Sequence, residues 1–278
     1  MSGATLWAIS DLHVGYAENR AIVDRLRPDS PDDWLIVAGD VAEHFAVIEA
    51  TLASLRERYA TVIWAPGNHE LWTHPNDPVT LRGVDRYDAL VRACREIDVL
   101  TPEDPYPVFT GVGGPVTIAP LFVLYDYSFR APGTTDTASS LRYAYRTGIV
   151  CTDEFLLHPD PYPGRAEWCW ARVAETERRL AAGDPDLPTV LVNHHPLVRE
   201  PTRILRHPEF AQWCGTDRTD DWPVRFRAAM VVYGHLHIPR TIDRDGVPHV
   251  EVSVGYPREW RRRGPNPPTA TRIVPVTA

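Results

Sequence analysis

Short apolar runs that end in polar residues recur five times along the chain. Each run is rich in β-branched, aromatic or other strand-forming residues, and each is followed closely by Asp, Asn or His. Continuous apolar runs of this kind are typical of strands that are covered on both faces. The pattern therefore predicts five buried strands that present polar groups at their C-terminal ends. The five runs are residues 5–10, 34–38, 61–65, 189–192 and 230–233.

Between these runs the apolar positions follow the period of an amphipathic helix. Residues 43–59 show it most clearly, because Phe45, Ile48, Leu52 and Leu55 fall at helical spacing. Strands that alternate with helices predict an α/β unit whose sheet is largely parallel. The expected helices cover about 18–27, 43–59, 79–97 and 165–180.

The rest of the chain is less regular. Residues 116–118 and 121–124 are expected to be strands of a second, partly antiparallel region, and short strands near 248–254 and 271–276 are expected to close the fold. Periodicity is lost over about 125–164 and 197–228, and connections of that length are usually functional or mobile. Since no repeat or linker divides the chain, we expect one domain over 1–278, with two irregular inserts that flank the site.

Composition excludes several kinds of chemistry. All 29 basic residues are arginine, so Schiff-base lysines and the lysine of a phosphate-binding P-loop are absent. The net charge of −8 argues against a nucleic-acid or anionic-membrane partner. No signal peptide or membrane-spanning run is evident, which favours a cytoplasmic protein. The four cysteines lack CxxC spacing and are expected to be reduced, most of them buried: Cys94, Cys151, Cys169 and Cys214.

The residues at the strand ends are metal-ligand types. Imidazoles mixed with carboxylate and amide oxygens, without thiolates, suit Mn, Fe, Zn or Co better than an all-oxygen Ca or Mg site or a structural zinc site. Seven such groups are too many for one tetrahedral ion, but they fit two adjacent ions that share a carboxylate. Such a pair clamps a phosphoryl group and activates water. The seven candidates are Asp11, His13, Asp40, Asn68, His194, His235 and His237.

The order of these motifs resembles that of the calcineurin-like metallophosphoesterases. The matching segments are Asp11-x-His13, Gly39-Asp40-x-x-Glu43, Gly67-Asn68-His69-Glu70, His194-His195-Pro196 and Gly234-His235-x-His237. The resemblance implies a four-layer α/β/β/α sandwich of two mixed sheets, with the metal site at the strand C-termini. It also implies that Asp11, His13 and His237 hold one ion, that Asn68, His194 and His235 hold the other, and that Asp40 bridges them.

The resemblance further implies how catalysis is divided. A metal-bridging hydroxide is the expected nucleophile, and His69 is expected to donate a proton or hydrogen bond to the leaving oxygen. Glu43 stands where an acid orients this histidine. Two histidines have open assignments: His195 is either a neighbour of the substrate or a structural residue, and His44 is either a phosphate contact or a solvent-facing residue at a helix N-terminus. The remaining histidines are expected at the surface: His74, His158, His207 and His249.

Together these features predict a dinuclear metal-dependent hydrolase that acts on phosphate esters of a small molecule. Its cofactors would be two divalent or mixed-valence ions, with Mn, Fe or Zn favoured, and both monoesters and diesters remain possible substrates. A phosphoprotein substrate is disfavoured, because the chain lacks the Arg before GNHE and the GDYVDRG-type motif of protein serine/threonine phosphatases. The alternative is a non-catalytic scaffold that keeps the fold. The complete ligand set and His69 favour the enzyme.

Overall fold

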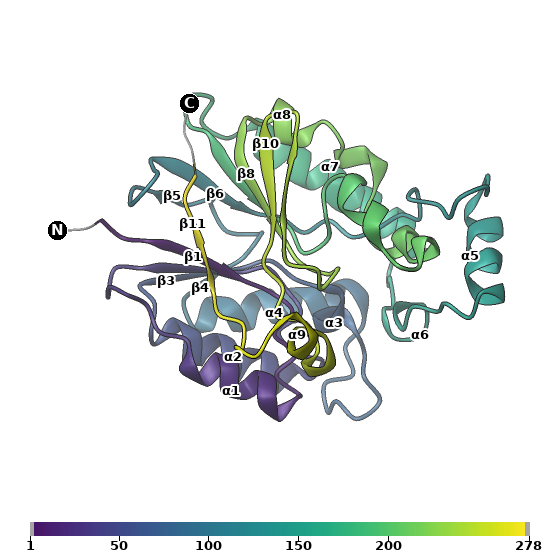
Figure 1. The fold of residues 1–278 in the computed structure, drawn as a ribbon, viewed down its shortest axis with the longest axis horizontal. Coiled ribbons are helices and arrows are strands. Elements are labelled where there is room, and N and C mark those ends of the chain that lie inside the picture. The colour runs from purple at the N-terminus through teal and green to yellow at the C-terminus, as the bar shows by residue number, and fades with distance from the viewer. Residues whose placement is uncertain (1–2, 276–278) are drawn as a thin grey trace.

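Two β-sheets face each other, and helices cover the outer face of each (Figure 1). The structure is a computed structural model and describes residues 3–275. The helices that follow the first strands lie against one sheet, and α7 and α8 lie against the other. This is the four-layer α/β/β/α arrangement that was expected, with two mixed sheets.

The first sheet is built mainly from the N-terminal third of the chain. Its order is β11-β1-β2-β3-β4, in which β1 to β4 are parallel and β11 is an antiparallel edge strand. The N-terminal part is therefore the largely parallel unit that strand and helix alternation predicts. The strands are β1 Leu6–Ile9, β2 Trp34–Val37, β3 Thr61–Trp64, β4 Val99–Leu100 and β11 Thr271–Ile273.

The second sheet contains the other two predicted ligand-bearing strands. Its order is β5-β6-β7-β8-β10-β9, with four central parallel strands and an antiparallel strand at each edge. The strands are β5 Val108–Phe109, β6 Val116–Pro120, β7 Thr189–Val192, β8 Ala228–Tyr233, β9 Thr241–Arg244 and β10 Val247–Glu251.

The long helices match the expected ones to within a few residues. No helix in residues 3–275 combines the length and the apolar composition needed to cross a bilayer. The helices are α1 Ala17–Arg25, α2 Phe45–Arg56, α3 Asn68–Leu71, α4 Gly83–Glu96, α5 Thr137–Arg146, α6 Asp153–Leu156, α7 Arg165–Ala181, α8 Trp222–Arg225 and α9 Pro257–Arg263.

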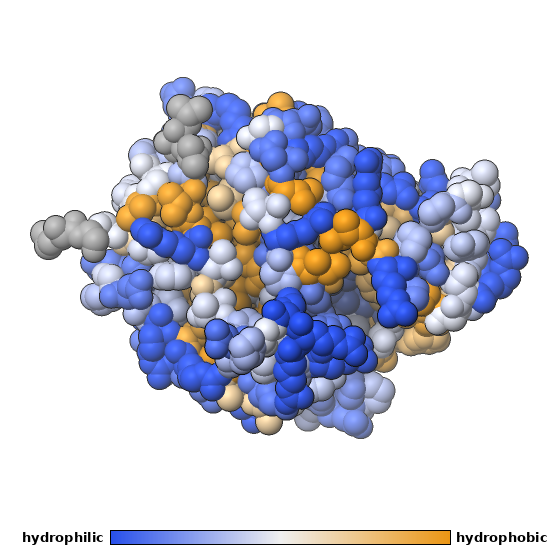
Figure 2. All heavy atoms as spheres, in the orientation of Figure 1, coloured by the Kyte–Doolittle hydropathy of each residue, from blue (hydrophilic) through white to orange (hydrophobic). Residues whose placement is uncertain are grey.

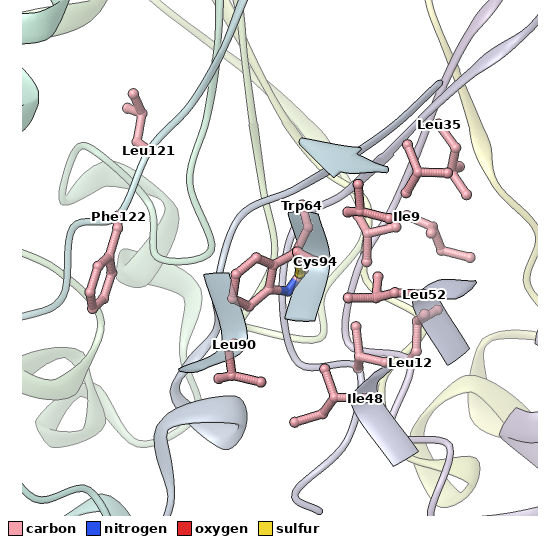
Figure 3. Close-up of a cluster of buried hydrophobic side chains, with 14 of the residues drawn as sticks. Ile9, Leu12, Leu35, Ile48, Leu52, Trp64, Leu90, Cys94, Leu121 and Phe122 are labelled. Atoms are coloured by element: carbon pink, nitrogen blue, oxygen red, sulfur yellow. The ribbon is translucent and has the colours of Figure 1, made fainter. Parts of the chain in front are cut away.

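Period-two alternation along each strand places side chains in two different cores. In β1, Leu6 and Ala8 point into the layer between the sheets, and Ile9 packs toward the helices. Figure 3 shows part of the helix-side core, with Trp64 of β3 surrounded by side chains from α2 and α4. Burial on both faces explains why these strands read as continuous apolar runs.

The expected strand at 121–124 is wrong. These residues are buried but follow the end of β6, and Asn193 supplies hydrogen bonds in place of a neighbouring strand. The Val123 N–H donates to Asn193 Oδ1 over 3.0 Å, and Asn193 Nδ2 donates to the Val123 carbonyl over 3.1 Å. The expected closing strand is also shorter, since β11 ends at Ile273 and residue 276 lies outside the described residues.

The two inserts contain more regular structure than their sequences suggested. The first insert, 125–164, contains α5 and α6. The buried residues of α5 are Ser140 and Ala144, so the helix lacks the large apolar side chains that reveal a period. The second insert, 197–228, contains α8 and three short 3-10 helices, η1 Glu200–Ile204, η2 Pro208–Trp213 and η3 Asp217–Thr219.

A buried arginine links α4 by hydrogen bonds to α3, to the loop between these two helices and to the segment before α2. The Arg86 side chain is fully buried and donates to the Asp77 carboxylate over 3.0 Å, and to the carbonyls of Glu43, Glu70 and Val79. Asp77 also accepts the Phe45 N–H. A buried ion pair is tolerated only when such bonds satisfy both partners.

We expect Asp77→Ala to lower the free energy of unfolding by about 3–5 kcal/mol, because it leaves the Arg86 charge buried without a carboxylate to balance it. Asp221→Ala is the matched control. It removes an exposed partner of Arg225 and is expected to cost less than about 1 kcal/mol. Denaturant unfolding of both variants measures the difference, and equal effects would contradict the role given to the buried pair.

Candidate metal centre

Five strand ends converge on one site. Asp11 and His13 follow β1, Asp40 follows β2 and Asn68 follows β3, while His194 and His235 follow β7 and β8 of the second sheet. Parallel strands place their C-terminal ends at the same edge of a sheet, and the two sheets face each other. This geometry is therefore consistent with the prediction from the sequence that these side chains lie close together.

The backbone at these positions is strained. Asp11, His13, Asp40, His235 and His237 all have positive φ angles, between 42° and 72°. Each non-glycine residue in this region costs on the order of 1–3 kcal/mol and persists where the surrounding structure enforces it. Such residues cluster at functional sites, as they do here.

Two glycines of the motifs make room for the carboxylates. A Cβ at Gly67 would collide with the backbone and carboxylate of Asp40, and one at Gly234 would collide with Ser10 and the Asp11 carboxylate. Gly67 and Gly234 therefore let neighbouring strand ends approach each other closely enough to share one site.

The first group of donors comprises Asp11, His13 and His237. His237 Nε2 lies 2.9 Å from Asp11 Oδ1 and 3.2 Å from His13 Nε2. One ligand atom from each of the three residues lies within 4.8 Å of the others, a spacing suited to one metal ion.

The second group comprises Asn68, His194 and His235. Asn68 Oδ1 lies 3.1 Å from His194 Nε2 and 3.2 Å from His235 Nδ1, and the two ring nitrogens are 3.3 Å apart. One amide oxygen and two imidazole nitrogens thus converge on a second point.

Asp40 lies between the two groups. Its Oδ2 is 3.9 Å from His13 Nε2 of the first group and 3.3 Å from His194 Nε2 of the second. Its Oδ1 accepts the backbone N–H of His69 over 3.0 Å, which holds the carboxylate in place. A carboxylate in this position can contribute to both groups.

The outer hydrogen bonds of two of the four imidazoles fit metal ligation. His194 Nδ1 donates to the Ala38 carbonyl over 2.9 Å, and His237 Nδ1 donates to Glu259 Oε2 over 2.6 Å. Each bond fixes the tautomer in which the neutral ring directs the Nε2 lone pair into the site. The converging nitrogens and oxygens, without a thiolate, fit divalent transition ions.

The charges within the site shift the pKa values of its imidazoles in opposite directions. Burial opposes protonation of His194 and His237, but Asp40 and Asp11 respectively raise their pKa values to about 10. Burial and the nearby His194 lower the pKa of His235 to about 3. Without metal, two imidazoles thus hold protons beside the carboxylates.

His69 lies at the rim of this cluster and pairs with Glu43, as the sequence suggested. Its Nδ1 is 3.1 Å from Glu43 Oε1, and its ring packs on Trp72 with centroids 3.7 Å apart. Burial opposes protonation, but the carboxylates of Asp40 and Glu43 together raise the pKa of His69 above its ordinary value. The protonated ring can donate from Nε2, which lies 3.7 Å from Asp40 Oδ2.

The remaining histidines differ in their surroundings. His195 is buried against His235, with ring centroids 4.4 Å apart, and neither ring nitrogen has a hydrogen-bond partner among the described residues. His44 is half-buried, directly before α2 and beside His74. The expectation that His249 lies at the surface is wrong: it is fully buried, because it occupies a covered face of β10.

Sequence reasoning missed the residues that support the ligands. The Glu70 carboxylate accepts the N–H groups of Asp40, Val41 and Gly67. Its place in the GNHE segment was a usable signal. Glu259, which binds His237, and Asp153, which binds Asn68 and Trp72, lie far from any motif and carry no comparable signal.

One side of helix α9 and the residue before it contact the first group of donors, and the other side of the helix is exposed at the protein surface. Glu259 reaches inward to His237, and Tyr256, directly before the helix, stacks on His13 with ring centroids 4.5 Å apart. Figure 2 shows hydrophilic side chains over this helix, which carries Arg258, Arg261, Arg262 and Arg263.

Comparison with known proteins agrees with this geometry. The family description "Calcineurin-like phosphoesterase" matches residues 4–239. The chain is 58% identical over 261 residues to the [Acyl-carrier-protein] phosphodiesterase PptH of Mycobacterium tuberculosis, covering 94% of this chain and 81% of that protein. The crystal structure of Phosphopantetheinyl Hydrolase (PptH) from Mycobacterium tuberculosis superposes with a TM-score of 0.96 at 55% identity, covering 99% of this chain and 97% of that one.

Both the family and the relative are named for hydrolysis of phosphate esters, which supports the enzyme over the scaffold. The match covers most of the chain and includes every predicted metal ligand. The chain belongs to the calcineurin-like phosphoesterase family and is a metal-dependent phosphoesterase.

Proposed function

We propose that the protein is a dinuclear phosphodiesterase that hydrolyses the ester linking a phosphopantetheinyl group to an acyl carrier protein. The observation that carries this proposal is the 58% identity to PptH over 94% of the chain, a share too large to leave out either insert. Specificity is expected to reside in those inserts, because the metal-binding motifs themselves serve many different esters.

This proposal changes the expected substrate in one respect. The sequence favoured a small phosphorylated molecule and disfavoured a phosphoprotein. A phosphopantetheinyl carrier combines the two, because the reacting diester belongs to a small group that is attached to a protein. The proposal also selects the diester from the two ester classes that the motifs left open.

The seven donors would hold two ions in the arrangement described above. Asp11, His13 and His237 would hold one ion, Asn68, His194 and His235 would hold the other, and Asp40 would contact both. When bound, divalent ions would neutralise charge on the phosphate oxygens and lower the pKa of water. Mn, Fe and Zn suit these donors.

His69 would supply the proton for the leaving group. During hydrolysis a water oxygen forms a bond to phosphorus, the bond from phosphorus to the carrier oxygen breaks, and that oxygen takes a proton. His69 is suited to donate it, because Glu43 holds Nδ1 and leaves Nε2 directed toward Asp40 and the site. His44 and His195 stay candidates for substrate contact.

The substrate is tested by incubating a phosphopantetheinyl carrier protein with the Mn-loaded enzyme and following the carrier by intact mass. We expect loss of the whole phosphopantetheinyl group, which regenerates the free hydroxyl of the carrier. An unchanged carrier, together with metal-dependent hydrolysis of an aryl diester, would contradict the substrate while leaving the enzyme class intact.

We expect His69→Ala to lower kcat by about 10²–10⁴-fold on an alkyl diester, while the metal content stays that of the wild type. The loss should be much smaller on a nitrophenyl diester, because that leaving group departs without a proton. Steady-state kinetics on both esters measure the contrast, and equal losses would rule out the acid role.

Metal binding is expected to release protons. His194 and His237 have pKa values raised to about 10, so both are protonated at pH 7 without metal, and both must lose the proton to ligate. Apparent metal affinity should therefore rise with pH between about 6 and 9. Calorimetric titration with Mn²⁺ in buffers of different ionisation enthalpy should report about two protons per chain from these imidazoles, and one more where a bound water is deprotonated. A binding enthalpy that does not depend on the buffer would contradict this.

A further inference from the structure

Asp153 connects the first insert to the donors of the second group. It is the first residue of α6 and is fully buried. Its Oδ1 accepts two hydrogen bonds, from Asn68 Nδ2 over 2.9 Å and from Trp72 Nε1 over 2.7 Å. Trp72 also forms a β-bridge with Leu157, so α6 is held against the segment that follows β3.

The bond to Asp153 determines which way the Asn68 amide faces. A carboxylate oxygen accepts hydrogen bonds, so it selects the NH₂ end of the amide. The carbonyl end must then point the other way, where Oδ1 meets His194 Nε2 and His235 Nδ1. With the amide reversed, its NH₂ group would face the ion and could not ligate.

The same oxygen also holds the packing partner of His69. Trp72 donates its indole N–H to Asp153, and its ring lies against the His69 ring. One buried carboxylate of the insert therefore supports both a metal ligand and the expected acid.

We propose that Asp153 is a positioning residue whose side-chain hydrogen bond orients Asn68 for the second metal ion. The inference rests on the proposed two-metal site. It assigns to the insert a part in building the metal centre, beyond any part in recognising the substrate.

Glu154, the residue after Asp153, allows the positioning role of Asp153 to be distinguished from general stabilisation of the insert. Glu154 receives hydrogen bonds from Tyr127 and Trp213 and forms an ion pair with Arg165, all of them residues of the two inserts or of α7. Within residues 3–275, none of its side-chain hydrogen bonds or ion pairs reaches a metal-ligand candidate. Loss of Glu154 would weaken the insert without releasing the Asn68 amide.

The test compares Asp153→Leu, Asp153→Asn and Glu154→Leu by metal content after dialysis and by competition with a chelator, using Mn²⁺ as the probe. In Asp153→Leu one ion should remain tightly bound, and the other should bind about 10–100-fold more weakly. Asp153→Asn keeps an oxygen acceptor and should stay within about tenfold of the wild type. Glu154→Leu should bind two ions normally.

Thermal unfolding, followed by circular dichroism, shows whether each variant is folded. The inference is overturned if folded Asp153→Leu binds both ions like the wild type, or if Glu154→Leu loses the second ion to the same extent. It is also overturned if Asp153→Asn fails as severely as Asp153→Leu, because the charge, and not the oriented acceptor, would then matter. A wild-type protein that binds one ion would instead refute the two-metal proposal itself.

Discussion

The structure depends on holding seven polar donors within a few ångströms of one another inside a protein. Taken out of water without partners, such groups would oppose folding. Here five of them lie in left-handed backbone at strand ends, and close contacts at Gly67 and Gly234 bring those ends together. Hydrogen bonds from outside the donor set then fix the orientation of the His194 and His237 rings and of the Asp40 carboxylate. The result is a site formed in advance, in which neighbouring carboxylates hold protons on two imidazoles until cations replace them.

Much of the fold and most of the site could be predicted from the sequence, for a physical reason. Strands that are buried on both faces read as continuous apolar runs. The ligands follow those runs closely in the sequence, so the end of each run marks where a ligand lies in the structure, as at Asp11, Asp40 and His194. Helix α2 was equally visible, because its buried face carries Ile48, Leu52 and Leu55.

The features that could not be predicted leave no such pattern in the sequence. Helix α5 buries Ser140 and Ala144, which give no apolar period. Residues 121–124 are apolar because they are buried, yet they form no strand, and the backbone of Val123 bonds to the Asn193 side chain instead. Glu259 and Asp153 reach the site across long sequence separations, and nothing near them in the chain indicates what they will contact. His249 was misplaced because one residue inside a strand does not reveal which face is covered.

The two inserts pack beside the metal-ligand candidates. The first insert follows the segment after β6, and the second follows His194 at the end of β7. The two inserts pack against each other through Glu154 and Trp213. Residues of both lie beside the site, Asp153 against Asn68 and Phe210 against His235, with ring centroids 6.1 Å apart in the second case. Recognition of a carrier-bound group and construction of the metal centre would thus involve the same segments.

The central claim is that two ions occupy these seven donors and share Asp40. Anomalous diffraction from crystals of the metal-loaded protein, recorded at the absorption edges of Mn, Fe and Zn, tests it most directly. The account predicts two peaks, one among Asp11, His13 and His237 and one among Asn68, His194 and His235, with the Asp40 carboxylate reaching both. A single peak at full metal loading, or a second peak away from Asn68 and His194, would contradict it.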